Sequence, residues 1–442
     1  MSTERRDPIS WKEYQSPKHD WRNRRFFRRV PRALLYGTGA FLIVVLVVYA
    51  GSLISGYLGE ASHRYPKLTK SPHSSPRKIS NADLPGFLKG LDLCSTEPQN
   101  HFITDHDGAR LRVESSIDPG LQDYITALLA SSKTLKAAVV ALRPEDGRVL
   151  AMVHYDNGGD GWNLCLKADF PAASLFKIVS AAAALESAGL TPDSPVYFTG
   201  RKYTLYKSQL KEKKGGYATK TSFKKAFASS INSVFGKLGI YQLGQERIAD
   251  SASKFFFNRI IPFDLPVAKS TIQVPDENFG LAEIASGFNK RTLISPLHAA
   301  ILASAVANDG VMMRPWLIKS VSNEEGDVLF ECKPVVLGSP ITKETARDLR
   351  ILMQETVING TCRKSFRRVR RKKPFREVEF GAKTGSINDE TGRFKYDWLA
   401  AYAIPPNGDK AICIAVLGVH GERLGIRASE LGRYILSYYL KS

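Results

Sequence analysis

Cysteine is scarce in this sequence of 442 residues, and the five cysteines form no recognisable pattern. There is no CxxC pair and no histidine at metal-ligand spacing, so neither a zinc site nor a redox motif is indicated. In an oxidising compartment one disulfide could form, and the odd number would leave at least one thiol over. The cysteines are Cys94, Cys165, Cys332, Cys362 and Cys413.

Acidic residues are few in three segments, and these segments explain the net charge of +20. Residues 1–32 carry ten Lys/Arg against four Asp/Glu, residues 201–225 nine against one, and residues 363–376 nine against none. The net charges of the three segments add up to more than the net charge of the whole chain, so the rest of the chain is slightly acidic. Each basic segment therefore needs its own explanation. No nucleic-acid-reading motif accompanies them, which argues against a nucleic acid as partner.

Charge of either sign is missing from residues 33–58, ALLYGTGAFLIVVLVVYAGSLISGYL. As a helix this segment would reach roughly 39 Å, against about 30 Å of hydrocarbon. It predicts one transmembrane helix; a buried soluble helix and a cleaved signal peptide, which would be shorter, are the alternatives. Arginines crowd the end of the basic tail 1–32, so we expect that tail in the cytoplasm and everything after residue 58 outside. No cysteine lies near the end of the apolar segment, and this argues against a lipid-modified start.

The rest of the chain divides into a linker and one folded unit. Residues 59–112 begin rich in Ser, Pro and Lys and are predicted to lift residues 113–442 off the membrane. HFITDHDG, residues 101–108, gathers His101, Asp105, His106 and Asp107 as conceivable metal ligands, but turns collect the same residue types. From residue 113, strand-like segments lie near both ends of the unit and helix-like segments lie between them. This order predicts an α+β fold whose sheet is completed by both chain ends. There is no internal repeat.

The stretch PAASLFKIVSAAAALESAG, residues 171–189, places a serine and a lysine three positions apart. A helix that begins after Ala172 would bring Ser174 and Lys177 together on one face. A serine hydroxyl becomes a nucleophile when a neighbour takes its proton, and a neutral lysine can be that base. The lysine pKa must then fall from about 10.4 to near 7, which burial and a second cation can achieve. An ordinary helix whose lysine reaches water is the competing interpretation.

Two further motifs favour the catalytic interpretation. SSINSVFGKLG holds Ser230 and Asn232, a hydroxyl and a carboxamide that one turn could direct into a cleft. GAKTGSIND holds Lys383, Thr384 and Gly385, and a glycine within a strand permits close approach of another backbone or a ligand. The three motifs S-x-x-K, S-x-N and K-T-G in this order are far rarer than any one alone, so they predict a shared site.

With these motifs the sequence resembles the penicillin-binding proteins, specifically their serine D,D-transpeptidase domain. The resemblance extends to SSIDPGLQ, AAVVALRPEDGRVLAMV, SPLHAAILASAVANDGVMMRP, the NGT before the last motif and the Asp-Trp after it. It covers residues 113–442 and implies the α+β penicillin-binding transpeptidase fold, in which a helical layer covers the sheet. It implies no cofactor and no metal.

The resemblance also implies a role for each motif residue. Ser174 would attack the D-alanine carbonyl of a peptidoglycan stem peptide, and Lys177 would accept its proton. Ser230 would relay a proton to the leaving amine, Asn232 would hydrogen-bond the substrate amide, and Lys383 would supply positive charge. The substrate-binding residues of the last motif would be Thr384, which holds the terminal carboxylate, Gly385, and Ser386, whose N–H would complete an oxyanion hole with that of Ser174.

Two departures from the family pattern are present: Ser386 replaces the usual threonine, and Ala382 replaces the glycine before the lysine. The 59–112 region is also too short for a glycosyltransferase domain, so glycan polymerisation would need a partner protein in trans. β-Lactam antibiotics would be covalent ligands, and the location would be the bacterial cytoplasmic membrane with the catalytic domain outside. The alternatives are a D,D-carboxypeptidase or β-lactamase on the same scaffold, or a non-catalytic β-lactam sensor or assembly component.

The basic run RKSFRRVRRKKPFR, residues 363–376, directly precedes the K-T-G motif, so we expect it at the rim of the cleft. Its nine cations could bind membrane lipid headgroups or acidic wall polymers. A solvated loop is the competing interpretation. The 201–225 segment is expected to form a lid or hairpin beside the site.

Overall fold

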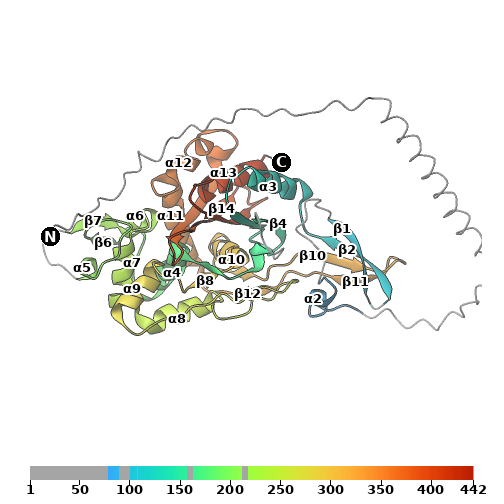
Figure 1. Cartoon of the computed structure of the whole chain (residues 1–442), viewed down its shortest axis with the longest axis horizontal. Coiled ribbons are helices and arrows are strands. Elements are labelled where there is room, and N and C mark those ends of the chain that lie inside the picture. Colours follow the sequence, from blue (N-terminus) through green and yellow to red (C-terminus); the bar gives the residue numbers. More distant parts are fainter. Residues whose placement is uncertain (1–77, 89–99, 107, 157–162, 212–217, 442) are drawn as a thin grey trace, which may run out of the picture. The chain divides into compact units, whose positions relative to one another are not determined.

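The computed structural model describes residues 78–88, 100–106, 108–156, 163–211 and 218–441 (Figure 1). The predicted membrane span at 33–58 and the basic tail before it lie outside these residues. Across the described ranges no helix has the length and apolar character needed to cross a membrane. The described residues, from Lys78 onward, belong to one compact unit.

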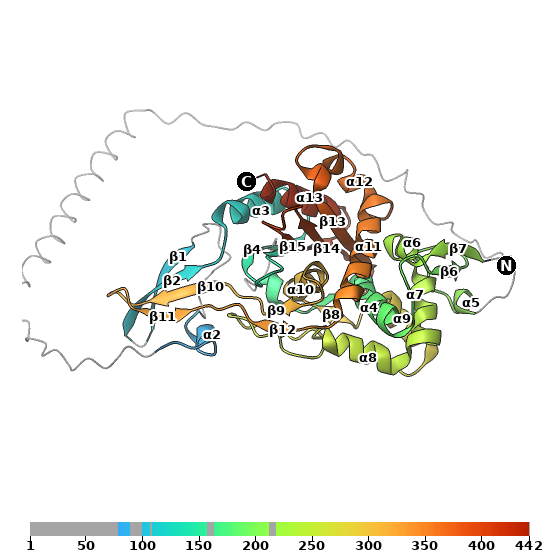
Figure 2. The same ribbon diagram turned by 180° about the vertical axis from the view of Figure 1, so that it is seen from behind.

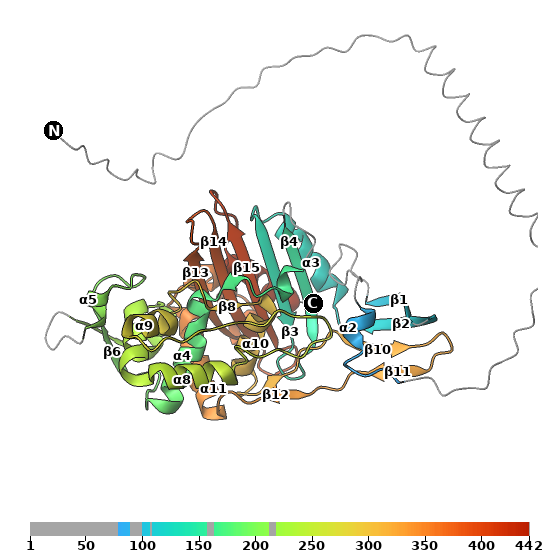
Figure 3. The ribbon, with the colours of Figure 1, turned by 60° about the horizontal axis from the view of Figure 1, so that its bottom comes forward.

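A five-stranded antiparallel sheet in the order β13-β14-β15-β3-β4 is the centre of this unit (Figure 3). Strand β15 pairs with β3 in the register Val416 to Val139, which joins the two ends of the folded unit as the sequence predicts. The strands are β3 (Lys136–Leu142), β4 (Val149–Asp156), β13 (Glu379–Asn388), β14 (Lys395–Ile404) and β15 (Ile412–His420).

Alternate residues of each strand point to opposite faces, and both faces are covered by helices. Val139 and Val416 pack with α3 (Pro119–Ala130) and α13 (Ala428–Tyr439) on one face. Val140 and Ala415 pack on the other face against a helical layer that includes α4 (Lys177–Ser187) and α10 (Pro296–Ala307). Figures 1 and 2 show this three-layer arrangement from both sides. Burial on both faces explains why these strands read as continuous apolar runs.

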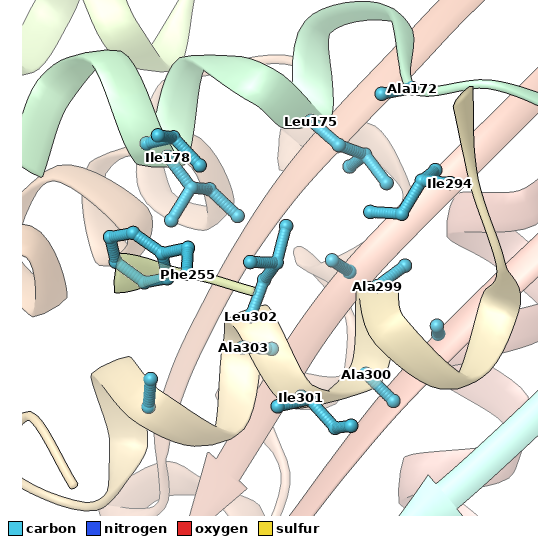
Figure 4. Close-up of a cluster of buried hydrophobic side chains, with 14 of the residues drawn as sticks. Ala172, Leu175, Ile178, Phe255, Ile294, Ala299, Ala300, Ile301, Leu302 and Ala303 are labelled. Atoms are coloured by element: carbon cyan, nitrogen blue, oxygen red, sulfur yellow. The ribbon is translucent and has the colours of Figure 1, made fainter. Parts of the chain in front are cut away.

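Helix α10 packs against the segment that carries Ser174 and Lys177 (Figure 4). Every residue of α10 is buried, and all but His298 and Ser304 are apolar, as expected of a core helix. Figure 4 shows Leu175 pointing towards Ile294 and Ala299, while Ile178 points towards Leu302. All five side chains are at most 1% exposed, so the segment from 175 to 178 has little freedom to move.

A second sheet, in the order β1-β2-β10-β11, includes part of the region before residue 113. His101, Asp105 and His106, considered above as metal ligands, belong to β1, and Asp107 lies outside the described residues. Leu84 and Leu88, from the region predicted as a linker, belong to the main hydrophobic core. These two residues therefore pack against the folded unit. The strands are β1 (His101–His106), β2 (Ala109–Ser115), β10 (Ile318–Ser322) and β11 (Val328–Glu331).

The remaining elements surround these sheets. The other strands form two-stranded pairs: β5 (Phe170–Pro171) with β8 (Leu293–Ile294), β6 (Pro195–Phe198) with β7 (Thr219–Ser222), and β9 (Met312–Met313) with β12 (Val336–Gly338). The other α-helices are α2 (Leu84–Phe87), α5 (Lys207–Leu210), α6 (Phe223–Ala228), α7 (Asn232–Leu238), α8 (Gly244–Lys254), α9 (Asn278–Ser286), α11 (Lys343–Ile358) and α12 (Arg363–Phe366). Strand β7 lies within the 201–225 segment, where a lid or hairpin is expected, and its partner β6 precedes that segment.

Candidate active site

Ser174 lies in a tight 3₁₀ turn, Ala173–Phe176, that leads directly into α4. The preceding Ala173 has a φ of +48°, which is unfavourable for a residue with a Cβ. Gly287, with a φ of +63°, packs so closely on this turn that a Cβ at that position would lie 2.0 Å from the carbonyl oxygen of Ala173. The turn is therefore held in a strained shape by its neighbours.

Lys177 begins α4 and is fully buried. Its Nζ lies 2.9 Å from the Oγ of Ser174 and 2.8 Å from the Oδ1 of Asn232, and it also donates to the carbonyl of Ser286. Burial, and then the positive charge of Lys383, lower the pKa of Lys177 well below its usual value. The competing interpretation, a lysine that reaches water, is therefore wrong.

Ser230 and Asn232 come from the turn between α6 and α7. Ser230 has a φ of +53°, and Asn232 is the first residue of α7, so the two polar groups face the same space. The Nδ2 of Asn232 donates to the carbonyl of Tyr203 over 3.0 Å, which fixes the orientation of the amide. The expected hairpin around 201–225 thus stands beside the site and orients one of its residues.

Lys383 lies on the edge strand β13 and is fully buried. Its Nζ donates to the Oγ of Ser230 over 3.1 Å and to the carbonyl of Thr384 over 2.8 Å. Burial lowers the pKa of Lys383 to about 7. Since each lysine is desolvated and the charge of Lys383 disfavours a second proton nearby, we expect Lys177 to be the neutral amine of the pair.

A cleft of about 400 Å³ opens where the three motifs meet. Six of the eight predicted site residues line it, and the two lysines lie buried behind Ser174 and Ser230. Gly385 stands so near the turn Ala173–Phe176 that a Cβ there would be 3.3 Å from the backbone nitrogen of Ser174. The lining residues are Ser174, Tyr203, Ser230, Asn232, Gly287, Phe288, Thr361, Thr384, Gly385, Ser386, Lys395, Asp397, Arg427 and Ser429.

The sequence analysis gave no role to several groups in this site, although it noted the NGT and Asp-Trp segments. The carbonyl of Ser286 and the backbone of Tyr203 left no signal, because any residue type supplies a carbonyl. Thr361, from the NGT segment, has its Oγ1 2.6 Å from that of Thr384. Asp397 follows the last motif, and its Oδ2 accepts a hydrogen bond from the backbone of Ala428 over 3.0 Å.

Comparison with known proteins assigns the class. Residues 137–431, more than half of the chain, match the family described as the penicillin binding protein transpeptidase domain. The chain therefore belongs to this family, and the resemblance inferred from the motifs is confirmed.

Individual relatives are similar over most of the unit. The chain is 26% identical over 385 residues to peptidoglycan D,D-transpeptidase PbpA of Mycolicibacterium smegmatis, covering 77% of this chain and 74% of that protein. It is 27% identical over 379 residues to peptidoglycan D,D-transpeptidase MrdA of Haemophilus influenzae, covering 74% of this chain and 56% of that protein. The crystal structure of PBPA from Mycobacterium tuberculosis superposes with a TM-score of 0.61 at 24% identity, covering 74% of this chain and 80% of the other, which shows the shared fold.

Proposed function

We propose that this chain is a membrane-anchored peptidoglycan D,D-transpeptidase that forms an acyl-enzyme on Ser174. The observation that carries the proposal is the 2.9 Å contact between the Ser174 hydroxyl and the buried amine of Lys177, inside a cleft walled by the other two motifs. The similarity to proteins named peptidoglycan D,D-transpeptidases supports the choice of substrate.

The first half of the reaction breaks the bond between the two D-alanines. The Oγ of Ser174 attacks the carbonyl carbon of the penultimate D-alanine while its proton passes to Lys177. The backbone N–H groups of Ser174 and Ser386 stabilise the oxyanion, an effect of about 2.7 to 4 kcal/mol per donor. Ser230 delivers a proton to the departing D-alanine amine, and the stem remains as an ester on Ser174.

Binding of the stem uses the polar groups around the nucleophile. Lys383, which touches Ser230, supplies positive charge towards the terminal carboxylate, and Thr384 and Ser386 hydrogen-bond that carboxylate. Asn232 is held by Lys177 and Tyr203 and offers its amide to the substrate backbone. In the second half of the reaction an amine of another stem attacks the ester, which gives a cross-link and restores Ser174.

The membrane anchor and the partner follow from the sequence. The apolar segment 33–58 with the basic tail 1–32 before it supports a single span with the catalytic unit outside the cytoplasmic membrane. The 59–112 region is too short to hold a glycosyltransferase domain, so we infer that another protein polymerises the glycan strands.

The purified full chain in neutral detergent tests this function. A synthetic stem peptide ending in D-Ala-D-Ala is incubated with and without an amine acceptor, and the products are identified by mass spectrometry. A transpeptidase transfers the stem to the amine, whereas a carboxypeptidase releases it to water even when the amine is present. The Ser174→Ala variant is the control and should give neither product.

Fluorescent penicillin distinguishes a transpeptidase from a β-lactamase and from a β-lactam sensor. A stable covalent adduct with peptide turnover supports the transpeptidase, and rapid loss of the adduct supports a β-lactamase. A stable adduct without any peptide turnover supports the sensor. No adduct on the wild type would overturn the proposal.

A further inference from the structure

A second pocket, of about 940 Å³, opens on the basic run 363–376 and is larger than the catalytic cleft. Its walls come from α12, from the short 3₁₀ turn Val369–Arg371 and from α13. Glu430 is the carboxylate in this lining. Six cationic side chains face it: Arg363, Lys364, Arg367, Arg368, Lys372 and Arg433.

These cations are uncompensated within the described part of the chain, where none of the six forms an ion pair with a carboxylate. The guanidinium of Arg433 stacks on the ring of Tyr434, 3.7 Å from its centroid, which leaves its N–H groups available at the edge. A smaller adjoining pocket is lined by Arg363, Arg367, Arg370 and Arg371. So many like charges in a concave surface repel one another, and a bound anion relieves that repulsion.

The basic pocket adjoins the catalytic cleft. Gly360 lines the pocket while its neighbour Thr361 lines the cleft. Ser365 of the pocket and Ser429 of the cleft share a hydrogen bond of 3.0 Å between their hydroxyls. The pocket therefore lies beside the active site, on short helical turns whose cationic side chains are mostly exposed to solvent.

We propose that this pocket binds a ligand that carries two or more phosphate groups, either as a diphosphate or as neighbouring phosphodiester groups. Four of the six cations are arginines, whose planar fork matches phosphate oxygens in pairs. A single carboxylate would neutralise one of the six charges and fill little of the 940 Å³. The proposal stands beside the catalytic function and does not depend on it.

Inorganic diphosphate is the probe, titrated by calorimetry into the full chain in neutral detergent. The triple variant Arg363→Gln, Arg367→Gln, Arg433→Gln should raise the Kd by about tenfold or more, and added salt should weaken wild-type binding. A control variant, Lys269→Gln, Lys333→Gln, Lys410→Gln, removes the same charge from exposed positions outside both pockets and should keep the wild-type Kd within about twofold. Thermal unfolding of each variant checks that it is folded.

Further arms define the ligand class. Replacing the same three arginines by lysines keeps the charge and removes the fork, so its Kd should lie between those of the wild type and the glutamine variant. Citrate should bind more weakly than diphosphate; equal binding would contradict the phosphate preference. Cardiolipin, a lipid with two phosphodiester groups, is added to the micelles. It identifies a lipid headgroup if it displaces diphosphate, and a soluble or polymeric phosphate if it does not.

Three results would overturn the proposal: no binding of diphosphate to the wild type, equal weakening in the control variant, or binding of citrate as tight as that of diphosphate. The Ser174→Ala variant should bind diphosphate as the wild type does, so failure of the catalytic proposal and failure of this one are distinguishable.

Discussion

The Nζ of Lys177 lies 2.9 Å from the Oγ of Ser174, and the lysine side chain is fully buried. Burial, and then the positive charge of Lys383, hold the pKa of Lys177 well below its usual value, which favours the neutral amine that can accept the serine proton. Lys177→Met keeps an apolar chain of similar length and removes the base. We expect the rate of acylation by penicillin to fall about 10²- to 10⁴-fold. Stopped-flow labelling measures the rate, and circular dichroism checks the fold; labelling at the wild-type rate would exclude Lys177 as the base.

The acylation rate should depend on pH in a bell shape. It rises as Lys177 loses its proton, at a pH well below the usual lysine value, and falls above about 7 as Lys383 loses the charge that holds the substrate carboxylate. Lys383→Arg keeps that charge at all pH values, so the falling limb should disappear while the rising limb remains. If the falling limb survives in a folded Lys383→Arg protein, it arises from another group.

Gly287 should be required for the shape of the catalytic turn. Gly287→Ala adds a Cβ that would lie 2.0 Å from the carbonyl oxygen of Ala173, so the turn before Ser174 must shift. We expect acylation to slow by about tenfold or more, since small displacements of reacting groups are costly. Gly408→Ala is the matched control: its φ is also positive, at +75°, but nothing lies within 4 Å of the new Cβ. It should lose stability and keep the acylation rate.

Stability should fall in mild acid because of His298. This histidine is fully buried in α10, its Nε2 is 2.6 Å from the carbonyl of Phe255, and burial lowers its pKa to about 4. The unfolded chain takes up a proton on this histidine near pH 6.5, whereas the folded protein does so only near pH 4. The contribution of neutral His298 to the free energy of unfolding is therefore present above pH 6.5 and is lost between pH 6.5 and pH 4. It amounts to about 3 kcal/mol.

Urea unfolding of the wild type and of His298→Gln, at several pH values, measures the contribution of His298 to the free energy of unfolding. The difference in unfolding free energy between the two proteins should shrink by about 3 kcal/mol from pH 6.5 to pH 4. A difference that is independent of pH would mean that His298 does not titrate as expected.

The sequence predicted the reactive side chains of the site better than the backbone groups that hold them in place. Ser174, Lys177, Ser230 and Lys383 could be identified because side-chain chemistry at fixed spacing leaves a pattern. The carbonyl of Ser286 that holds Lys177 left none, since its position depends on how α9 ends beside α4.

The fold was also predictable in part from the sequence. Apolar runs near both ends of the folded unit predicted strands that meet, and β3 and β15 do pair. The pairing of β2 with β10 was not foreseen, because the partner strands lie some 200 positions apart and neither carries a motif. The basic pocket, likewise, needs α13 to supply Arg433 opposite α12.

Peptide mapping of the penicillin adduct tests the central claim most directly. The full chain is treated with penicillin, digested and analysed by mass spectrometry. We predict one acylated peptide, modified on Ser174, and its absence from the Ser174→Ala protein. An adduct on a different residue, or no adduct on a folded wild-type protein, would contradict the assignment of Ser174 as the nucleophile.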